Sequence, residues 1–509
     1  MKRFRFHPII FGTMLLTASG ILCRSIGFFY RIFLSNTIGE EGMGLYQLSF
    51  SAAAVCTALC CSGFQTAISR LTATAGKRLG EERQFLRAGL LLTMGISILV
   101  SSVFYSLANP IATIVLMEER CTPLLQFYAL SLPFSAIHNC LNGHYLGRQK
   151  ALLPALSQLV EQLVRMASIF IIWHIAKDNG RDLTPTDAMA GLFISELFVV
   201  LFLIPCYFAE RSSRTDRYTA DHTFFFACKS ICMMAFPLIA NRLGLTLLQS
   251  LETILIPGQL RAFGLSGSEA LSIYGVFTGM AIPFIMFPSS VTGSAATMTM
   301  PAIANAQSDE NSRQILRIAH GNIYFSLWLG IFAAGLFFLY GVPIGTAVFK
   351  SETAGIYLRT LSVACPFLYL TMTLASIING IGESKIIFFH TITGLLLRLL
   401  SVIFLIPVMG MDGYFLGTLL SQVTTCLLHY RYLKKNIGLP FYFKQYLFSP
   451  LLHTFAAGGI SLLCYTWLHD FLPGMPALLS LIICIGLMAA LAGILGLISF
   501  QKKRNPTAA

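Results

Sequence analysis

The feature that most constrains this chain is a succession of apolar runs, each long enough to cross a lipid bilayer. A membrane-spanning helix needs about 20 apolar residues, and the sequence predicts fourteen such helices. They cover residues 9–34, 44–70, 86–108, 122–145, 152–176, 187–208, 226–256, 271–300, 315–340, 356–380, 386–408, 412–432, 446–469 and 476–499. Only 11% of the residues are charged, compared with about 25% in a soluble domain. We therefore predict an all-α polytopic membrane protein, because helices satisfy their backbone hydrogen bonds internally.

The basic residues alternate between the two sides of the predicted membrane. With the N-terminus inside, 23 of the 35 Lys and Arg residues fall in inner segments and five in outer loops. The inner groups lie at residues 2–5, 77–87, 148–150, 211–229, 313–317, 385, 431–444 and 502–504. This asymmetry predicts cytoplasmic N- and C-termini in a cell membrane. The net charge of +13 then reflects topology and attraction to anionic lipids, and it requires no nucleic acid.

Three sequence blocks recur in the same order, which indicates an internal duplication. The pattern G-x-E-x4-Y occurs at residues 39–46 and 267–274, and R-Q-x-L-R at 83–87 and 313–317. A third pattern, PF-x30-R-x2-S, occurs at residues 133–168 and 366–401. Six helices per copy give both copies the same orientation. We predict six-helix lobes over 1–220 and 225–435, then an extra helix pair and a basic cytoplasmic tail over 436–509. In parallel-repeat transporters the substrate binds near the midplane between the repeats.

The first predicted helix carries two arginines on one polar face. A charged residue at the bilayer centre costs at least about 2.5–3.5 kcal/mol, so something must compensate Arg24 and Arg31. Their face steps by three or four residues and contains Thr13, Thr17, Gly20, Arg24, Gly27, Arg31 and Ser35. The arginines either pair with buried acids or carbonyl groups, or they line a polar cavity that takes an anionic ligand. Because few intramembrane acids are available and Arg fits phosphate bidentately, we favour the anionic ligand.

Similar polar faces occur on other predicted helices. Arg242 and Gln249 share a face of the seventh helix, with Glu252 beside it. On the fifth helix, Glu161 and Arg165 are spaced to pair directly, either as a structural contact or as part of the cavity. Glu196 and Arg398 are isolated charges that either line the cavity or seal a buried contact. Glu41 lies at the outer mouth, where a solvated loop is the plainer interpretation. The candidate substrate-binding residues are Arg24, Arg31, Glu41, Arg242, Gln249, Glu252 and Arg398.

Catalytic and metal-binding motifs are missing from the sequence. There is no C-x-x-C pair, zinc spacing or phosphate-binding loop, and the ten histidines are scattered, so we expect single core or interfacial histidines. We therefore predict no enzymatic activity, no metal and no cofactor. Large soluble loops would favour a non-transporting scaffold for cell-wall enzymes. A membrane glycosyltransferase would need acidic catalytic residues in a sizeable loop. The sequence shows no such loop between the predicted helices.

The segments C23-R-S-I-G-F-F-Y-R31, I38-G-E-E-G-M-G-L-Y-Q47 and G63-F-Q-T-A-I-S-R70 resemble the stage V sporulation protein B-like polysaccharide transport family. That family belongs, with the lipid II flippases, to the multidrug, oligosaccharidyl-lipid and polysaccharide exporter superfamily. The resemblance covers the whole chain. The sequence departs from the family pattern at Cys23, where serine is expected. The basic residue of the second helix in the lipid II flippases has no clear counterpart here.

The resemblance implies a flippase for a lipid-linked oligosaccharide or peptidoglycan precursor, working by alternating access. In the lipid II flippases, first-helix arginines and an acidic residue in the next outer loop are important. Arg24 and Arg31 match the former by position, and Glu41 roughly matches the latter. The resemblance also leaves open a cation-coupled multidrug exporter, for which the membrane charges here are mostly of the wrong sign. A coupling ion, Na+ or H+, is possible, and cell-wall synthesis enzymes are possible partners.

Overall fold

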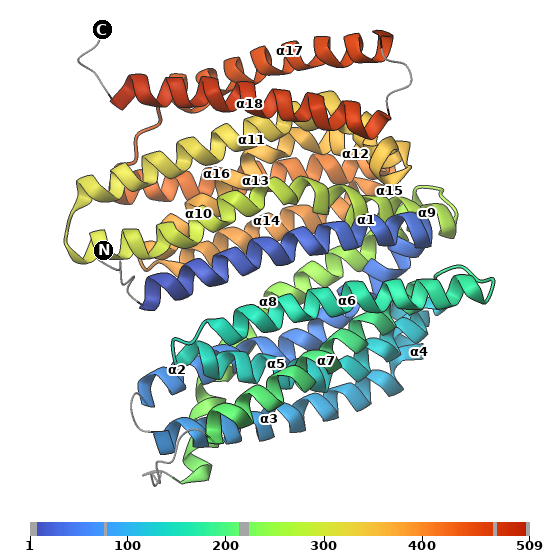
Figure 1. Cartoon of the computed structure of the whole chain (residues 1–509), viewed down its shortest axis with the longest axis vertical. Helices are drawn as coiled ribbons and strands as arrows, with labels where there is room; N and C mark the ends of the chain where they lie inside the picture. Colours follow the sequence, from blue (N-terminus) through green and yellow to red (C-terminus); the bar gives the residue numbers. More distant parts are fainter. Residues whose placement is uncertain (1–7, 76–78, 213–222, 472–475, 505–509) are drawn as a thin grey trace. The chain divides into compact units, whose positions relative to one another are not determined.

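The computed structural model describes residues 8–75, 79–212, 223–471 and 476–504, and its regular structure is entirely helical over these ranges (Figure 1). Several basic groups used to predict the topology, at residues 2–5, 77–78 and 214–217, lie outside the described residues. The orientation of the termini therefore stays a prediction.

Contacts divide the chain into two compact units. The first is Met1–Gly258 with Gly267–Gly275. Its helices are α1 (Pro8–Thr57), η1 (Ala58–Ser62), α2 (Gly63–Ala75), α3 (Leu79–Ser106), α4 (Ala108–Pro110), η2 (Ile111–Val115), η3 (Glu119–Cys121), α5 (Thr122–Gly147), α6 (Leu152–Asp178), α7 (Pro185–Ser212), most of α8 (Phe224–Ala262) and α9 (Gly267–Gly275).

The second unit is Gln259–Ser266 with Val276–Ala509. Its helices are η4 (Val276–Ala281), α10 (Ile282–Ser308), α11 (Ser312–Phe349), α12 (Glu352–Leu361), η5 (Ser362–Ala364), α13 (Cys365–Gly380), α14 (Ser384–Phe404), α15 (Ile406–Met409), α16 (Met411–Ile437), η6 (Lys444–Phe448), α17 (Ser449–Phe471) and α18 (Ala477–Arg504). The boundary after Gly275 falls where α9 passes through the π-helical turn η4 into α10.

Eleven helical runs among the described residues are long and apolar enough to cross a membrane. One of them, Met14–Ala75, covers the first predicted span from residue 14 onward and the whole of the second. Helices α5 and α16 coincide with predicted spans 122–145 and 412–432 but are not among the eleven. The prediction of an all-α polytopic membrane protein is confirmed, and the number fourteen stays a prediction.

The first helix is longer than the sequence suggested. We expected a break between residues 34 and 44, but helical structure continues to Thr57 and is interrupted only at Gly39, with φ 72° and ψ −177°. Glycine lacks the Cβ atom that makes positive φ costly for other residues. A kink at Gly39 therefore takes the place of the expected loop.

The two units repeat a packing pattern. In the first, α5 packs on α2, α3 and α7; in the second, α13 packs on α10, α11 and α16. Likewise α6 packs on α7, and α14 on α16. These equivalent contacts agree with two copies of one unit in the same order. The contact units group most of α8 with the N-terminal helices, but they do not test the predicted domain boundaries. The pair α17 and α18 packs together and on α11 (Figure 1).

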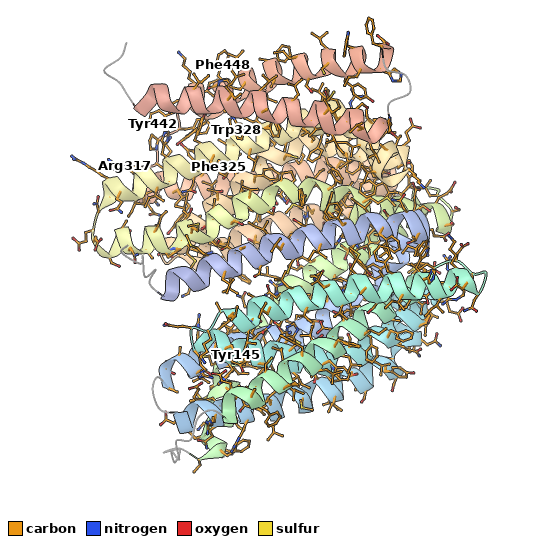
Figure 2. All side chains as sticks on the ribbon, viewed as in Figure 1. Tyr145, Arg317, Phe325, Trp328, Tyr442 and Phe448 are labelled. Carbon is orange, nitrogen blue, oxygen red and sulfur yellow. The ribbon has the colours of Figure 1, made fainter. Side chains whose placement is uncertain are left out.

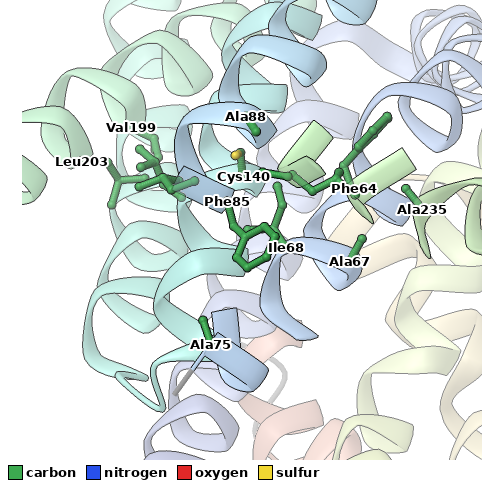
Figure 3. Close-up of a cluster of buried hydrophobic side chains, with 14 residues drawn as sticks. Phe64, Ala67, Ile68, Ala75, Phe85, Ala88, Cys140, Val199, Leu203 and Ala235 are labelled. Atoms are coloured by element: carbon green, nitrogen blue, oxygen red, sulfur yellow. The ribbon is translucent and has the colours of Figure 1, made fainter. Parts of the chain in front are cut away.

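Small residues let the helices of the first unit approach closely. Figure 3 shows a buried cluster in which Phe64, Ile68 and Phe85 are surrounded by smaller side chains such as Ala67 and Ala88. At Gly143 of α5, an added Cβ would lie 2.5 Å from the carbonyl oxygen of Gln65. Membrane helices commonly associate through such small residues, because lipid provides no hydrophobic force between them.

Candidate functional site

Helix α1 places Arg24 and Arg31 in different surroundings. Arg24 is exposed and Arg31 is partly buried. The guanidinium of Arg31 lies within electrostatic range of Tyr46, Tyr30 and Arg165. Neither Arg24 nor Arg31 forms a salt bridge with a carboxylate in the part of the chain that the structure describes. Arg24 and Arg31 thus have no carboxylate partner among the described residues, and Arg31 lies within electrostatic range of Arg165.

The predicted face of α8 is also present in the first unit. Arg242 and Gln249 are exposed, whereas Glu252 is buried with 1% of its surface exposed. Arg242 forms no salt bridge with any described acid. Ser250 donates a 2.8 Å hydrogen bond to the carbonyl oxygen of Ser51, which joins α8 to α1 at this point.

Glu41 of α1 forms an ion pair with Arg120 of η3. One of its oxygens lies 2.9 Å from Nη1 of Arg120, whose Nε donates to Glu118 at 2.6 Å. Arg120 is about half exposed. The hydrogen bond to Glu118 and then that to Glu41 raise the pKa of Arg120. Glu41 is thus held by a solvent-exposed arginine.

Arg398, the remaining candidate, lies partly buried on α14 in the second unit.

Glu161 and Arg165 form the ion pair that their spacing predicts. Nη2 of Arg165 donates to Oε1 of Glu161, and Nε of Arg165 lies 3.4 Å from Oγ of Ser195 on α7. Both charged side chains have 17% of their surface exposed. Unlike Arg24, Arg31 and Arg242, Arg165 is neutralised by a carboxylate.

A second polar contact lies beside this pair and was missed from sequence. Nδ1 of His138 on α5 lies 3.5 Å from Oε2 of Glu196 on α7. Oxygen or nitrogen atoms of His138, Glu161 and Glu196 all lie within 4.8 Å of one another. Sequence periodicity relates residues on one helix, so it gave no sign that α5, α6 and α7 bring these three together.

A mostly apolar groove of about 660 Å³ lies within the second unit, between α11, α13 and α17. Its wall includes Phe338, Pro366, Leu451 and Gly459. Figure 2 labels Phe325 and Trp328 on α11, and Tyr442 and Phe448 in the segment that leads into α17. In that segment the hydroxyl of Tyr446 lies 2.6 Å from Nδ1 of His320 on α11, so the approach to α17 is fixed to α11.

Among the described residues, eleven helical runs are long and apolar enough to cross a membrane, and the packing of α5 on its neighbours recurs for α13. These features define a multi-pass membrane protein. Residues 9–307 match the model of the polysaccharide biosynthesis protein family, and the chain belongs to that family.

Named relatives agree with this family. The chain is 24% identical to stage V sporulation protein B of Bacillus subtilis (strain 168), over 86% of each chain. It is 22% identical to the lipid II flippase MurJ of the same organism, over 84% of this chain and 82% of that one. Among solved structures, a lipid II flippase MurJ in an inward closed conformation has a TM-score of 0.73 at 14% identity. That match covers 96% of this chain and 99% of the other, and it shows a shared fold.

Proposed function

We propose that this protein is a flippase that moves a lipid-linked oligosaccharide or peptidoglycan precursor across the cell membrane by alternating access. One observation carries the proposal: Arg24, Arg31 and Arg242 lie on long apolar helices with no salt bridge to any described carboxylate. The named relatives support the same class of substrate, since one is a lipid II flippase. The proposal involves no covalent chemistry.

The pyrophosphate group of such a substrate suits these arginines. Each guanidinium presents a planar fork of N–H donors that matches two phosphate oxygens. A charged group in the bilayer costs a few kcal/mol, and a bound dianionic headgroup would compensate more than one arginine at once. We propose Arg24, Arg31 and Arg242 as pyrophosphate ligands, with Gln249 and Glu252 near the sugar. Arg398 and Glu41 stay candidates from sequence.

The polyprenyl tail requires an apolar path. The groove between α11, α13 and α17 provides an apolar wall in the second unit, and burial of each CH₂ group contributes about 0.8 kcal/mol. We propose that part of the tail lies in this groove while the rest stays in lipid.

A flipping assay tests the role of the arginines. Purified protein in liposomes should expose a labelled polyprenyl-pyrophosphate saccharide on the far side, and Arg24→Ala should slow this at least tenfold, the effect of losing about 1.4 kcal/mol. Arg181→Ala is the matched control, because Arg181 is an exposed arginine already paired with Asp187 at 2.7 Å. Unchanged flipping in well-folded Arg24→Ala would contradict the proposed role.

A second candidate function, a cation-coupled multidrug exporter, is favoured by the partly or fully buried carboxylates Glu161, Glu196 and Glu252. Thermal stabilisation separates the two. A polyprenyl pyrophosphate should raise the melting temperature of the detergent-solubilised protein, and cationic dyes should not. Stabilisation by dyes alone would favour drug export.

A further inference from the structure

We propose that His138 and Glu196 form a proton-binding site, and that a proton is the ion coupled to transport. The coupling rests on the proposed transport function, whereas proton binding at this pair does not. The pair joins α5 to α7 inside the first unit.

Both ring nitrogens of His138 face hydrogen-bond acceptors. Nδ1 lies 3.5 Å from Oε2 of Glu196, and that oxygen is buried with no closer hydrogen-bond partner among the described residues. Nε2 lies 3.2 Å from Oγ of Ser157. Ser157 has a single proton, and its hydroxyl is placed to donate it to Oδ1 of Asn142 at 3.1 Å or to the carbonyl oxygen of Pro154 at 2.9 Å. The Oγ lone pairs are then left to accept from Nε2.

The geometry can accommodate a doubly protonated imidazolium ring. Such a ring donates from Nδ1 to the Glu196 carboxylate and from Nε2 to the Ser157 hydroxyl. A neutral ring keeps one N–H group, and the Ser157 hydroxyl must then turn from Asn142 or Pro154 to donate to Nε2. Binding or release of the proton therefore changes both the charge that faces Glu196 and the hydrogen bonds that join α5 to α6 and α7.

The surrounding charges balance the bound proton. The titratable and charged groups within electrostatic range of His138 or Glu196 are Cys61 on η1, Tyr128 on α5, and Glu161 and Arg165 on α6. On α1, Cys23 lies within range of Glu161, and Tyr30, Arg31 and Tyr46 lie within range of Arg165. Arg165 is matched by Glu161, so Glu196 is the carboxylate left to balance His138. Arg165 also lies within electrostatic range of Arg31, which connects the site to a proposed pyrophosphate ligand.

The same neighbourhood disfavours a metal ion. His138, Glu161 and Glu196 could bring three ligand atoms together, but Arg165 already donates to Glu161. The guanidinium would repel a divalent cation more strongly than a single charge. The single positive charge of a protonated His138 faces the Glu196 carboxylate directly.

Infrared spectroscopy tests proton binding without any transport. Difference spectra of the full-length protein between about pH 5 and about pH 8, the range in which histidines ordinarily change charge, should contain imidazolium bands that are missing in His138→Gln. His390→Gln, which removes a partly buried histidine of the second unit, is the control and should leave those bands in place. Identical spectra for wild type and His138→Gln would overturn the proposal.

Transport assays test coupling. With the membrane potential clamped at zero, one unit of pH gradient should shift the distribution of labelled polyprenyl-pyrophosphate saccharide by up to about tenfold per coupled proton, and a sodium gradient should have no effect. His138→Gln should abolish the response, and the milder Ser157→Ala should weaken it.

The outcomes are distinct. A pH response that survives in His138→Gln, or a sodium response that is lost in both His138→Gln and Glu196→Gln, overturns the proton assignment. No flipping by the wild type contradicts the proposed function, and the infrared measurement still decides whether the pair binds a proton.

Discussion

Single arginines in this protein fall into two groups by what surrounds them. Arg165 lies against Glu161 and is neutralised inside the first unit, whereas Arg31 lies near two phenols and another arginine. Sequence spacing predicted the Glu161–Arg165 pair because both residues are on one helix. It could not predict the contact of His138 with Glu196, since that contact depends on which helices become neighbours.

The buried pair on α6 gives a stability prediction. Arg165→Met should destabilise the protein by about 3–5 kcal/mol, because it leaves the Glu161 carboxylate buried without its partner. The double variant Glu161→Leu with Arg165→Met should recover most of that loss. Chemical unfolding in detergent measures both, and a double variant as unstable as the single one would show that the pair is not the source of the loss.

At the level of elements, the ends of α3, α5 and α7 are joined by one ionic network. Nε of Arg148, which follows α5, lies 2.7 Å from Oε1 of Glu82 on α3, and its Nη2 lies 3.0 Å from Oε1 of Glu210 on α7. Lys150 also pairs with Glu210. From sequence, Arg148 and Lys150 only mark the predicted inner side, because their partners lie on helices distant in sequence.

Arg148→Ala should destabilise the protein more than Arg181→Ala. Arg148 is 11% exposed and holds two carboxylates, so Arg148→Ala should cost about 3–5 kcal/mol. Arg181 is 48% exposed and pairs with Asp187, so Arg181→Ala should have little effect on stability because exposed ion pairs are screened by solvent. Melting temperatures of the two variants in the same detergent test this, and equal shifts would contradict it.

At the scale of the whole molecule, hydropathy located the membrane helices well, and the order of repeated blocks anticipated the equivalent packing of α5 and α13. Composition could not give the kink at Gly39, since one glycine among 41 carries no mark of its φ angle. Nor could it give the groove between α11, α13 and α17, which depends on how apolar surfaces fit together and leaves no periodic signal.

The groove offers a test of the tail-binding proposal. An added Cβ at Gly459 meets no atom within 4 Å, and Gly459 lines the groove. Gly459→Phe should therefore place a ring at the groove wall with open space at its Cβ. The ligand concentration needed for stabilisation by polyprenyl pyrophosphate should rise at least tenfold.

Gly486 on α18 is the matched control, because its Cβ position is equally open and lies outside the groove wall. Gly486→Phe should leave binding unchanged. Equal effects of the two substitutions would contradict a place for the tail in this groove.

The predicted topology can be tested with reporters at the C-terminus. Because basic residues favour inner segments, a C-terminal green fluorescent protein fusion should fluoresce and an alkaline phosphatase fusion should be inactive in bacterial cells. The reverse result would place the C-terminus outside.

The π-helical turn η4 interrupts a helix that starts in one contact unit as α9 and ends in the other as α10. Such a turn holds an extra residue per hydrogen-bonded ring and so loosens the α-helical ladder locally. The two contact units are therefore joined through unbroken helical backbone, and the widened hydrogen-bond rings of η4 lie at that junction.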